Sequence, residues 1–212
     1  MSIKAWTRRD YISFFLFSVL VGDAIKESLT NVNRFIEQKF ELSTAYIAFW
    51  ALPAIFGITL IRFYIGNTLY LRYLSGEKKA VAIWALSFLI MLFQFTVLTL
   101  ISLNLKPDLL SKGKFFWMML ILLISDIVWI IILYIFKKSK ASKSMEYKIA
   151  IPQTWLLLDI IGTLYLAAGY ICYSSEIYTG DIHLFVMGML FILLGIIDLY
   201  TDFLRVVRQT VD

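Results

Sequence analysis

The chain has 212 residues, of which 60% are apolar and only 17% are charged, and it carries a net charge of +5. Its mean hydropathy is +0.80, whereas soluble domains are usually about half apolar and a quarter charged. The apolar residues form long blocks, and the polar stretches between them are too short to make a separate soluble domain. We therefore expect a single all-α integral membrane domain over residues 1–212.

Six apolar segments are candidates to cross the membrane, because about 20 apolar residues in a helix span the hydrocarbon core. They are residues 11–30, 44–71, 80–103, 115–136, 152–173 and 183–204. In the first segment the continuous apolar run covers only residues 11–22, a length that also fits a re-entrant or interfacial segment. The pattern predicts a polytopic helix bundle with about six transmembrane helices.

Residues 24–40 show a helical period with two distinct faces. The apolar positions are Ile25, Leu29, Val32, Ile36 and Phe40. The opposite face carries Lys26, Glu27, Asn31, Arg34 and Glu37. This pattern predicts an amphipathic segment after the first span, which lies along the membrane surface or packs on a neighbouring helix.

The Lys and Arg residues lie mainly between the apolar segments, where they determine orientation. With six spans and an inner N-terminus, the two sides hold 13 and 6 of these residues, whereas five spans would divide them 10 to 9. The positive-inside rule therefore favours six spans with both termini in the cytoplasm. Because orientation explains the basic residues, we expect no direct binding of nucleic acid.

An ionisable side chain in the middle of a span indicates a functional site, because its burial is costly unless it is paired. Arg62, Asp126, Asp159 and Asp198 lie in four different spans, at depths within about 6 Å of one another. Asn67 lies near Arg62 in the second span. Two interpretations are open: the cluster lines an ion pathway, or Arg62 pairs with the carboxylates and fixes the order of the helices.

Small residues recur at helical spacing in the last two spans and predict close helix packing. They are Gly162, Gly169, Gly188 and Gly195. Asp23 and Asp202 lie near predicted span ends, so we interpret both as solvated. The chain has one cysteine and one histidine, and it lacks the motifs of serine hydrolases, zinc peptidases and P-loop enzymes. We expect no enzymatic activity, no metal and no cofactor.

The surplus of intramembrane carboxylates favours an oligomeric channel or ion pathway for cations or protons. Such a protein could act as an effector that a separate partner controls. The alternative is a non-conducting anchoring or sensing subunit of a larger complex, whose basic loop at 137–148 docks a soluble cytoplasmic protein. The docking residues would be Lys137, Lys138, Lys140 and Lys143. The expected location is a bacterial inner membrane, with the lipid bilayer and further copies of the chain as neighbours.

The distribution of positive charge can be tested with reporter fusions. A fusion at the C-terminus and one within residues 137–151 should both report a cytoplasmic position, and one within residues 174–182 should report the outer side. A C-terminal fusion on the outer side would contradict six spans.

Overall fold

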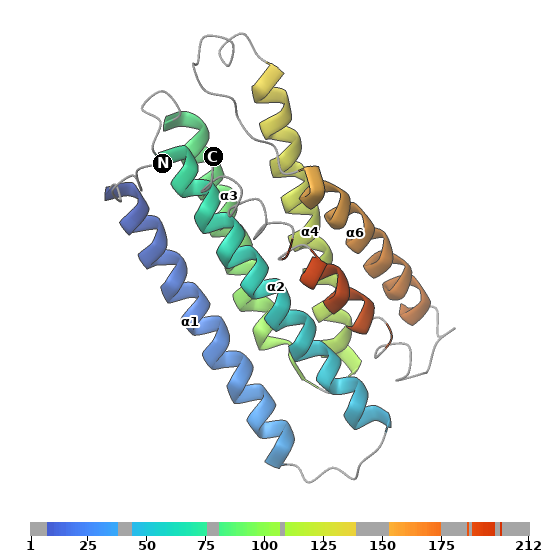
Figure 1. Ribbon diagram of the computed structural model, residues 1–212. Coiled ribbons are helices and arrows are strands. Elements are labelled where there is room, and N and C mark those ends of the chain that lie inside the picture. The colour runs from blue at the N-terminus through green and yellow to red at the C-terminus, as the bar shows by residue number, and fades with distance from the viewer. Residues whose placement is uncertain are drawn as a thin grey trace.

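The computed structural model describes residues 8–37, 44–75, 81–106, 109–138, 153–174, 186, 188–197 and 200. This part of the chain is helical and contains no strand. The labelled helices are α1 (Arg8–Glu37), α2 (Thr44–Ser75), α3 (Val81–Leu103), α4 (Leu109–Lys138) and α6 (Gln153–Ser174) (Figure 1). A further helix covers Gly188–Ile197. Asp198, Asp202, Lys140 and Lys143 lie outside the described residues.

Three segments are long and apolar enough to cross a membrane, namely Phe49–Thr68 in α2, Val81–Leu103 in α3 and Gly113–Phe136 in α4. Leu156–Ala168 in α6 and the helix Gly188–Ile197 are shorter and also apolar. Large apolar side chains are exposed on the outside of the bundle, among them Leu89, Ile135 and Leu164. An outer surface of this kind suits lipid rather than water, so the fold is that of a helical membrane protein.

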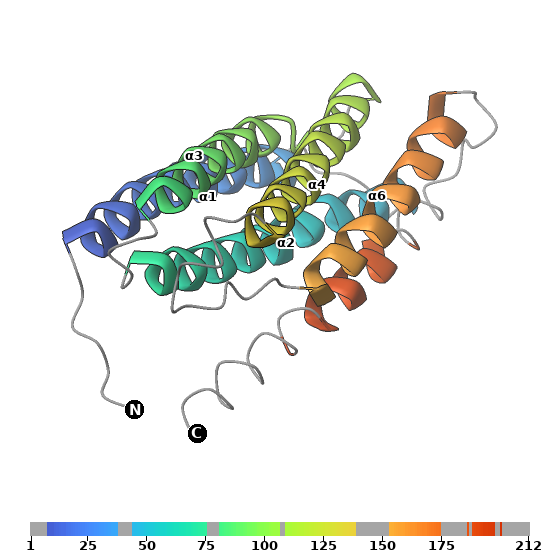
Figure 2. The same ribbon diagram turned by 90° about the horizontal axis from the view of Figure 1, so that it is seen from above.

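Helices that follow each other in the chain run in opposite directions. Ser18 of α1 meets Tyr64 of α2 at 3.1 Å, whereas the ring of Phe35, further along α1, packs against that of Phe49 near the start of α2. α1 and α3 share one direction and lie side by side (Figure 2). The same alternation continues through α4 and α6, and the Gly188–Ile197 helix runs parallel to α2.

α1 is one continuous helix of 30 residues, which differs from the predicted short span followed by a separate amphipathic segment. Nothing between residues 22 and 24 breaks the helix, because a single glycine is tolerated within one. The second half of α1 packs on α2 and α3. Packing on a neighbouring helix, one of the two predicted positions, is therefore what the structure shows for this segment.

The buried face of α1 is not its most apolar face. Phe17, Ala24, Ser28, Asn31 and Phe35 are buried at helical spacing. In the second half of α1, Ile25, Leu29 and Ile36 instead point outward, with about half of each side chain exposed. This inside-out arrangement is typical of helices whose outer surroundings are apolar.

Glycines allow the Gly188–Ile197 helix to approach α2 closely. A Cβ at Gly188 would lie 2.6 Å from the Cβ of Ala51, and one at Gly195 would lie 2.9 Å from Cγ1 of Ile58. A Cβ at Gly162 of α6 would meet Leu123 at 3.1 Å and Phe191 at 3.4 Å. These three glycines therefore act in helix packing, as small residues do in membranes.

Substitution of Gly188 by alanine should destabilise the bundle by about 1–3 kcal/mol, because two backbones must separate to admit the Cβ. Gly57 of α2 is a matched control, since an added Cβ there meets nothing within 4 Å. Gly57→Ala should be neutral or stabilising by up to about 1 kcal/mol through helix propensity. Unfolding in detergent micelles measures both effects, and equal shifts for the two variants would contradict this packing.

Candidate functional site

A buried ion pair connects α2 to α6. The Nη2 atom of Arg62 donates a hydrogen bond of 2.6 Å to Oδ1 of Asp159. The same nitrogen lies 3.9 Å from Oδ2 of Asp126 on α4. Asp159 is fully buried, Asp126 is 2% exposed and Arg62 is 7% exposed. One guanidinium thus holds two carboxylates from two other helices inside the bundle.

Two amide side chains extend this ion pair to α3. Nε2 of Gln94 donates to Oδ1 of Asp126 at 3.0 Å. Nδ2 of Asn67 donates to Oε1 of Gln94 at 3.1 Å. The result is one buried network of five side chains on α2, α3, α4 and α6. We call it the charge network, and its members are Arg62, Asn67, Gln94, Asp126 and Asp159.

The charge network fixes the neighbours and the relative heights of four helices. A buried charge without a partner is expensive in a protein core, and more so where lipid replaces water outside. Each helix must therefore present its network residue at the same level as the others, which excludes helix rotations or shifts that would separate the partners. The physical role that the geometry supports directly is a polar staple of the bundle.

A small cavity adjoins Arg62 between α2, α4, α6 and the Gly188–Ile197 helix. Its volume is about 20 Å³, and Thr59, Gly162 and Phe191 are among its lining residues. A cavity of this size admits about one water molecule. It is too small for an ion with its hydration shell, so the interior next to Arg62 is packed.

The structure brings together three of the four charged residues that the sequence singled out. Arg62, Asp126 and Asp159 meet directly, and Asn67 reaches them through Gln94 rather than by its own contact. Asp198 lies outside the described residues. Among the predicted docking residues, Lys137 and Lys138 are the last residues of α4, and among the packing glycines Gly169 lies in α6.

Gln94 was not identified from the sequence, although a signal was present. It is the only amide side chain between Val81 and Leu103, a helix otherwise made of apolar, serine and threonine residues. Two other buried polar contacts were also missed. Nε1 of Trp129 donates to Oγ of Ser87 at 3.1 Å, and Nδ2 of Asn31 donates to the Ser102 carbonyl at 2.9 Å.

A second polar feature lies on the outside of α1. Six polar side chains lie at helical spacing along its outward side, two of them adjacent in the sequence, and all are exposed or half-buried. We call them the polar stripe: Asp23, Lys26, Glu27, Thr30, Arg34 and Glu37. Three of the six are acidic and two are basic, so the stripe is weakly acidic.

Two contacts with α3 determine the height of the polar stripe. The Arg9 guanidinium stacks 5.7 Å from the Trp84 ring at the start of α3, and Asn31 binds Ser102 near the end of α3. Asp23 precedes Asn31 by eight residues, or about 12 Å along the helix. It therefore lies level with the apolar part of α3, and its side chain is exposed there.

Comparisons with protein-family models, curated proteins and solved structures find no match to this chain. Fold and site together define the class: a helical membrane protein with a buried charge network and an exposed polar stripe.

Substitution of Arg62 by methionine should destabilise the bundle by about 3–5 kcal/mol, because it leaves two carboxylates buried without their cation. The exposed Arg34 provides a matched control, and Arg34→Met should change stability by less than about 0.5 kcal/mol. Adding Asp159→Leu to Arg62→Met should restore part of the loss. Unfolding in detergent measures all three, and a double variant as unstable as Arg62→Met would contradict the pairing.

Proposed function

We propose that this chain crosses the membrane six times and assembles with further copies into an oligomer that provides an ion pathway between subunits. The alternating helix directions support six crossings, since each successive helix returns across the same layer. The excess of Lys and Arg on the N-terminal side supports cytoplasmic termini in a bacterial inner membrane.

The polar stripe is the observation that carries this proposal. A charged side chain at the centre of a lipid bilayer costs about 2.5–3.5 kcal/mol. Asp23 and Lys26 are exposed at a height where α3 is apolar, so contact with lipid would be unfavourable for both. Water enclosed between subunits, or polar groups of another subunit, removes this cost.

In this proposal the charge network stabilises the helix bundle and does not line the ion pathway. Its carboxylates are buried beside a guanidinium, and the adjoining cavity admits about one water molecule. The stripe, by contrast, is accessible along much of α1. Its three carboxylates against two cations favour cations over anions, although the preference should be modest. A rigid, stapled bundle is a suitable support for such a surface.

A second candidate function is a non-conducting anchoring or sensing subunit. The sealed charge network favours it, because a packed interior is what a scaffold requires. The polar stripe would then pair with complementary charges on a helix of a different membrane protein. The end of α4, at Lys137 and Lys138, would lead into a basic loop that docks a soluble partner. In either case a separate partner would control the protein.

Accessibility of the polar stripe distinguishes the two functions. In a Cys172→Ser background, Lys26→Cys should react with a membrane-impermeant cationic thiol reagent, and the reaction should reduce the current in planar bilayers. Leu89→Cys on α3 is the matched control, because Leu89 is 60% exposed on an apolar surface. It should remain unreactive, since lipid excludes the reagent.

Neutralisation of Asp23 and Glu27 to Asn and Gln should shift the reversal potential toward lower cation selectivity. Asp159→Asn should leave the selectivity unchanged. If the wild-type protein carries no current in bilayers and the Lys26→Cys variant does not react with the reagent, the pathway is refuted and the anchoring subunit is favoured.

A further inference from the structure

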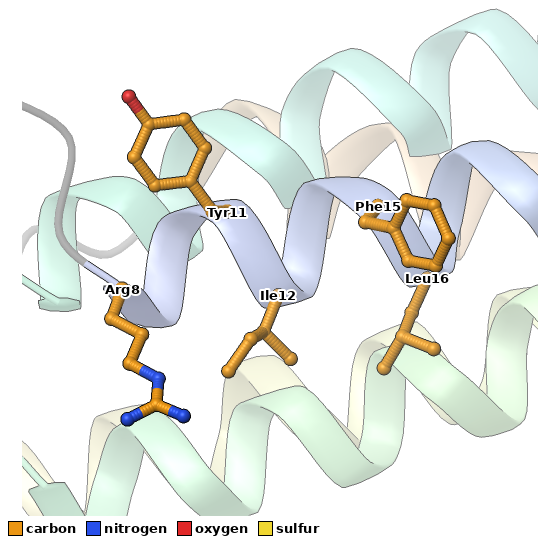
Figure 3. Close-up of a pocket in the computed structure, with 5 residues that line it drawn as sticks. All are labelled: Arg8, Tyr11, Ile12, Phe15 and Leu16. Carbon is orange, nitrogen blue, oxygen red and sulfur yellow. The ribbon is translucent and has the colours of Figure 1, made fainter.

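The first turns of α1 line a wide, open pocket on the outer surface of the bundle (Figure 3). Its lining residues are Arg8, Tyr11, Ile12, Phe15 and Leu16, and its volume is about 510 Å³. The four residues other than Arg8 are large and apolar or aromatic, and all four are exposed. We call this feature the N-terminal groove.

The two adjacent arginines at the start of α1 have different surroundings. The guanidinium of Arg9 stacks over the ring of Trp84 on α3. Arg8 is exposed, and its side chain extends from the same side of the helix as Ile12 and Leu16 (Figure 3). This alignment follows from their spacing of four residues, which places them one above another. The groove therefore has a cationic end followed by an apolar strip.

We propose that the N-terminal groove binds an anionic phospholipid from the leaflet on the N-terminal side of the membrane. The Arg8 guanidinium holds the phosphate, a geometry for which arginine is well suited. One acyl chain lies along Ile12 and Leu16. The binding requires only that the protein be inserted in a membrane, so it does not depend on ion conduction.

The dimensions of the groove fit one lipid leaflet. Arg8 and Leu16 are eight residues apart, or about 12 Å along the helix. Half of a typical hydrocarbon core is about 15 Å. The polar stripe begins at Asp23, two turns beyond Leu16, so apolar and polar surfaces succeed each other on one side of α1 near the middle of the membrane.

Charge favours a lipid over a second copy of the chain as the occupant. Two subunits related by an axis along the membrane normal present the same residue at the same height. A second copy of α1 in the groove would place Arg8 beside another Arg8, and two arginines repel each other. A phosphate in that position is attracted, particularly in a leaflet rich in anionic lipid.

Native mass spectrometry of the full chain in detergent tests the proposal with phosphatidylglycerol and phosphatidylcholine of identical acyl chains. The wild type should bind phosphatidylglycerol more tightly. Arg8→Gln should lower this preference about fivefold, the effect expected for one basic residue near a headgroup. Arg8→Lys should retain most of it, because the charge remains. Leu16→Gln should weaken the binding of both lipids equally, since it alters only the apolar strip that contacts the acyl chain.

Arg34→Gln is the matched control, because Arg34 is exposed at the opposite end of α1. It should leave the preference for phosphatidylglycerol unchanged. Equal binding of both lipids by the wild type, full preference in Arg8→Gln, or an equal loss in Arg34→Gln would each overturn the site. Two chains that carry both Ile12→Cys and Cys172→Ser could instead form a disulfide with each other. If added phosphatidylglycerol does not lower the yield of this crosslink, the groove is occupied by a second copy.

Discussion

The ion pair between Arg62 and Asp159 is the constraint on which the rest of the bundle depends. Its two partners come from α2 and α6, and Asp126 and Gln94 attach α4 and α3 to the same point. Apolar side chains alone would not specify the order of the helices. Lipid is as apolar as a leucine side chain, so a helix gains little free energy when it replaces contacts with lipid by contacts with another apolar helix. A buried charge that must find its partner supplies the missing specificity, and glycines then permit close contact with the last described helix.

α1 stands apart from this arrangement. It contributes no residue to the charge network and packs only on α2 and α3 among the labelled helices. Its buried side combines aromatic rings with small and polar residues, whereas the side that carries Arg8, Ile12 and Leu16 is apolar after Arg8 and becomes polar from Asp23 onward. In the proposals made above, the apolar part would meet lipid in one leaflet, and the polar part would meet protein or enclosed water in the other.

Much of the charge network was predictable from rules about single residues. Arg62, Asp126 and Asp159 stand out because ionisable groups are rare in apolar segments, and counting residues from the span ends places them at one height. Gln94 could have been found by the same reasoning applied to neutral polar groups. The pairing of these residues could not be predicted from the sequence. The depth of a residue does not determine how its helix is rotated or which helix lies beside it.

The sequence by itself determined the class of the protein, because hydrophobicity and segment length are properties of the chain that no packing can alter. It also determined which polar residues need partners within the bundle. The tertiary structure decided that α1 is a single continuous helix, that its apolar residues at Ile25 and Leu29 face outward, and that Asp23 is exposed at the level of the apolar part of α3. An amphipathic pattern has the same period whether its apolar face meets protein or lipid, so only the contacts with neighbouring helices could distinguish the two.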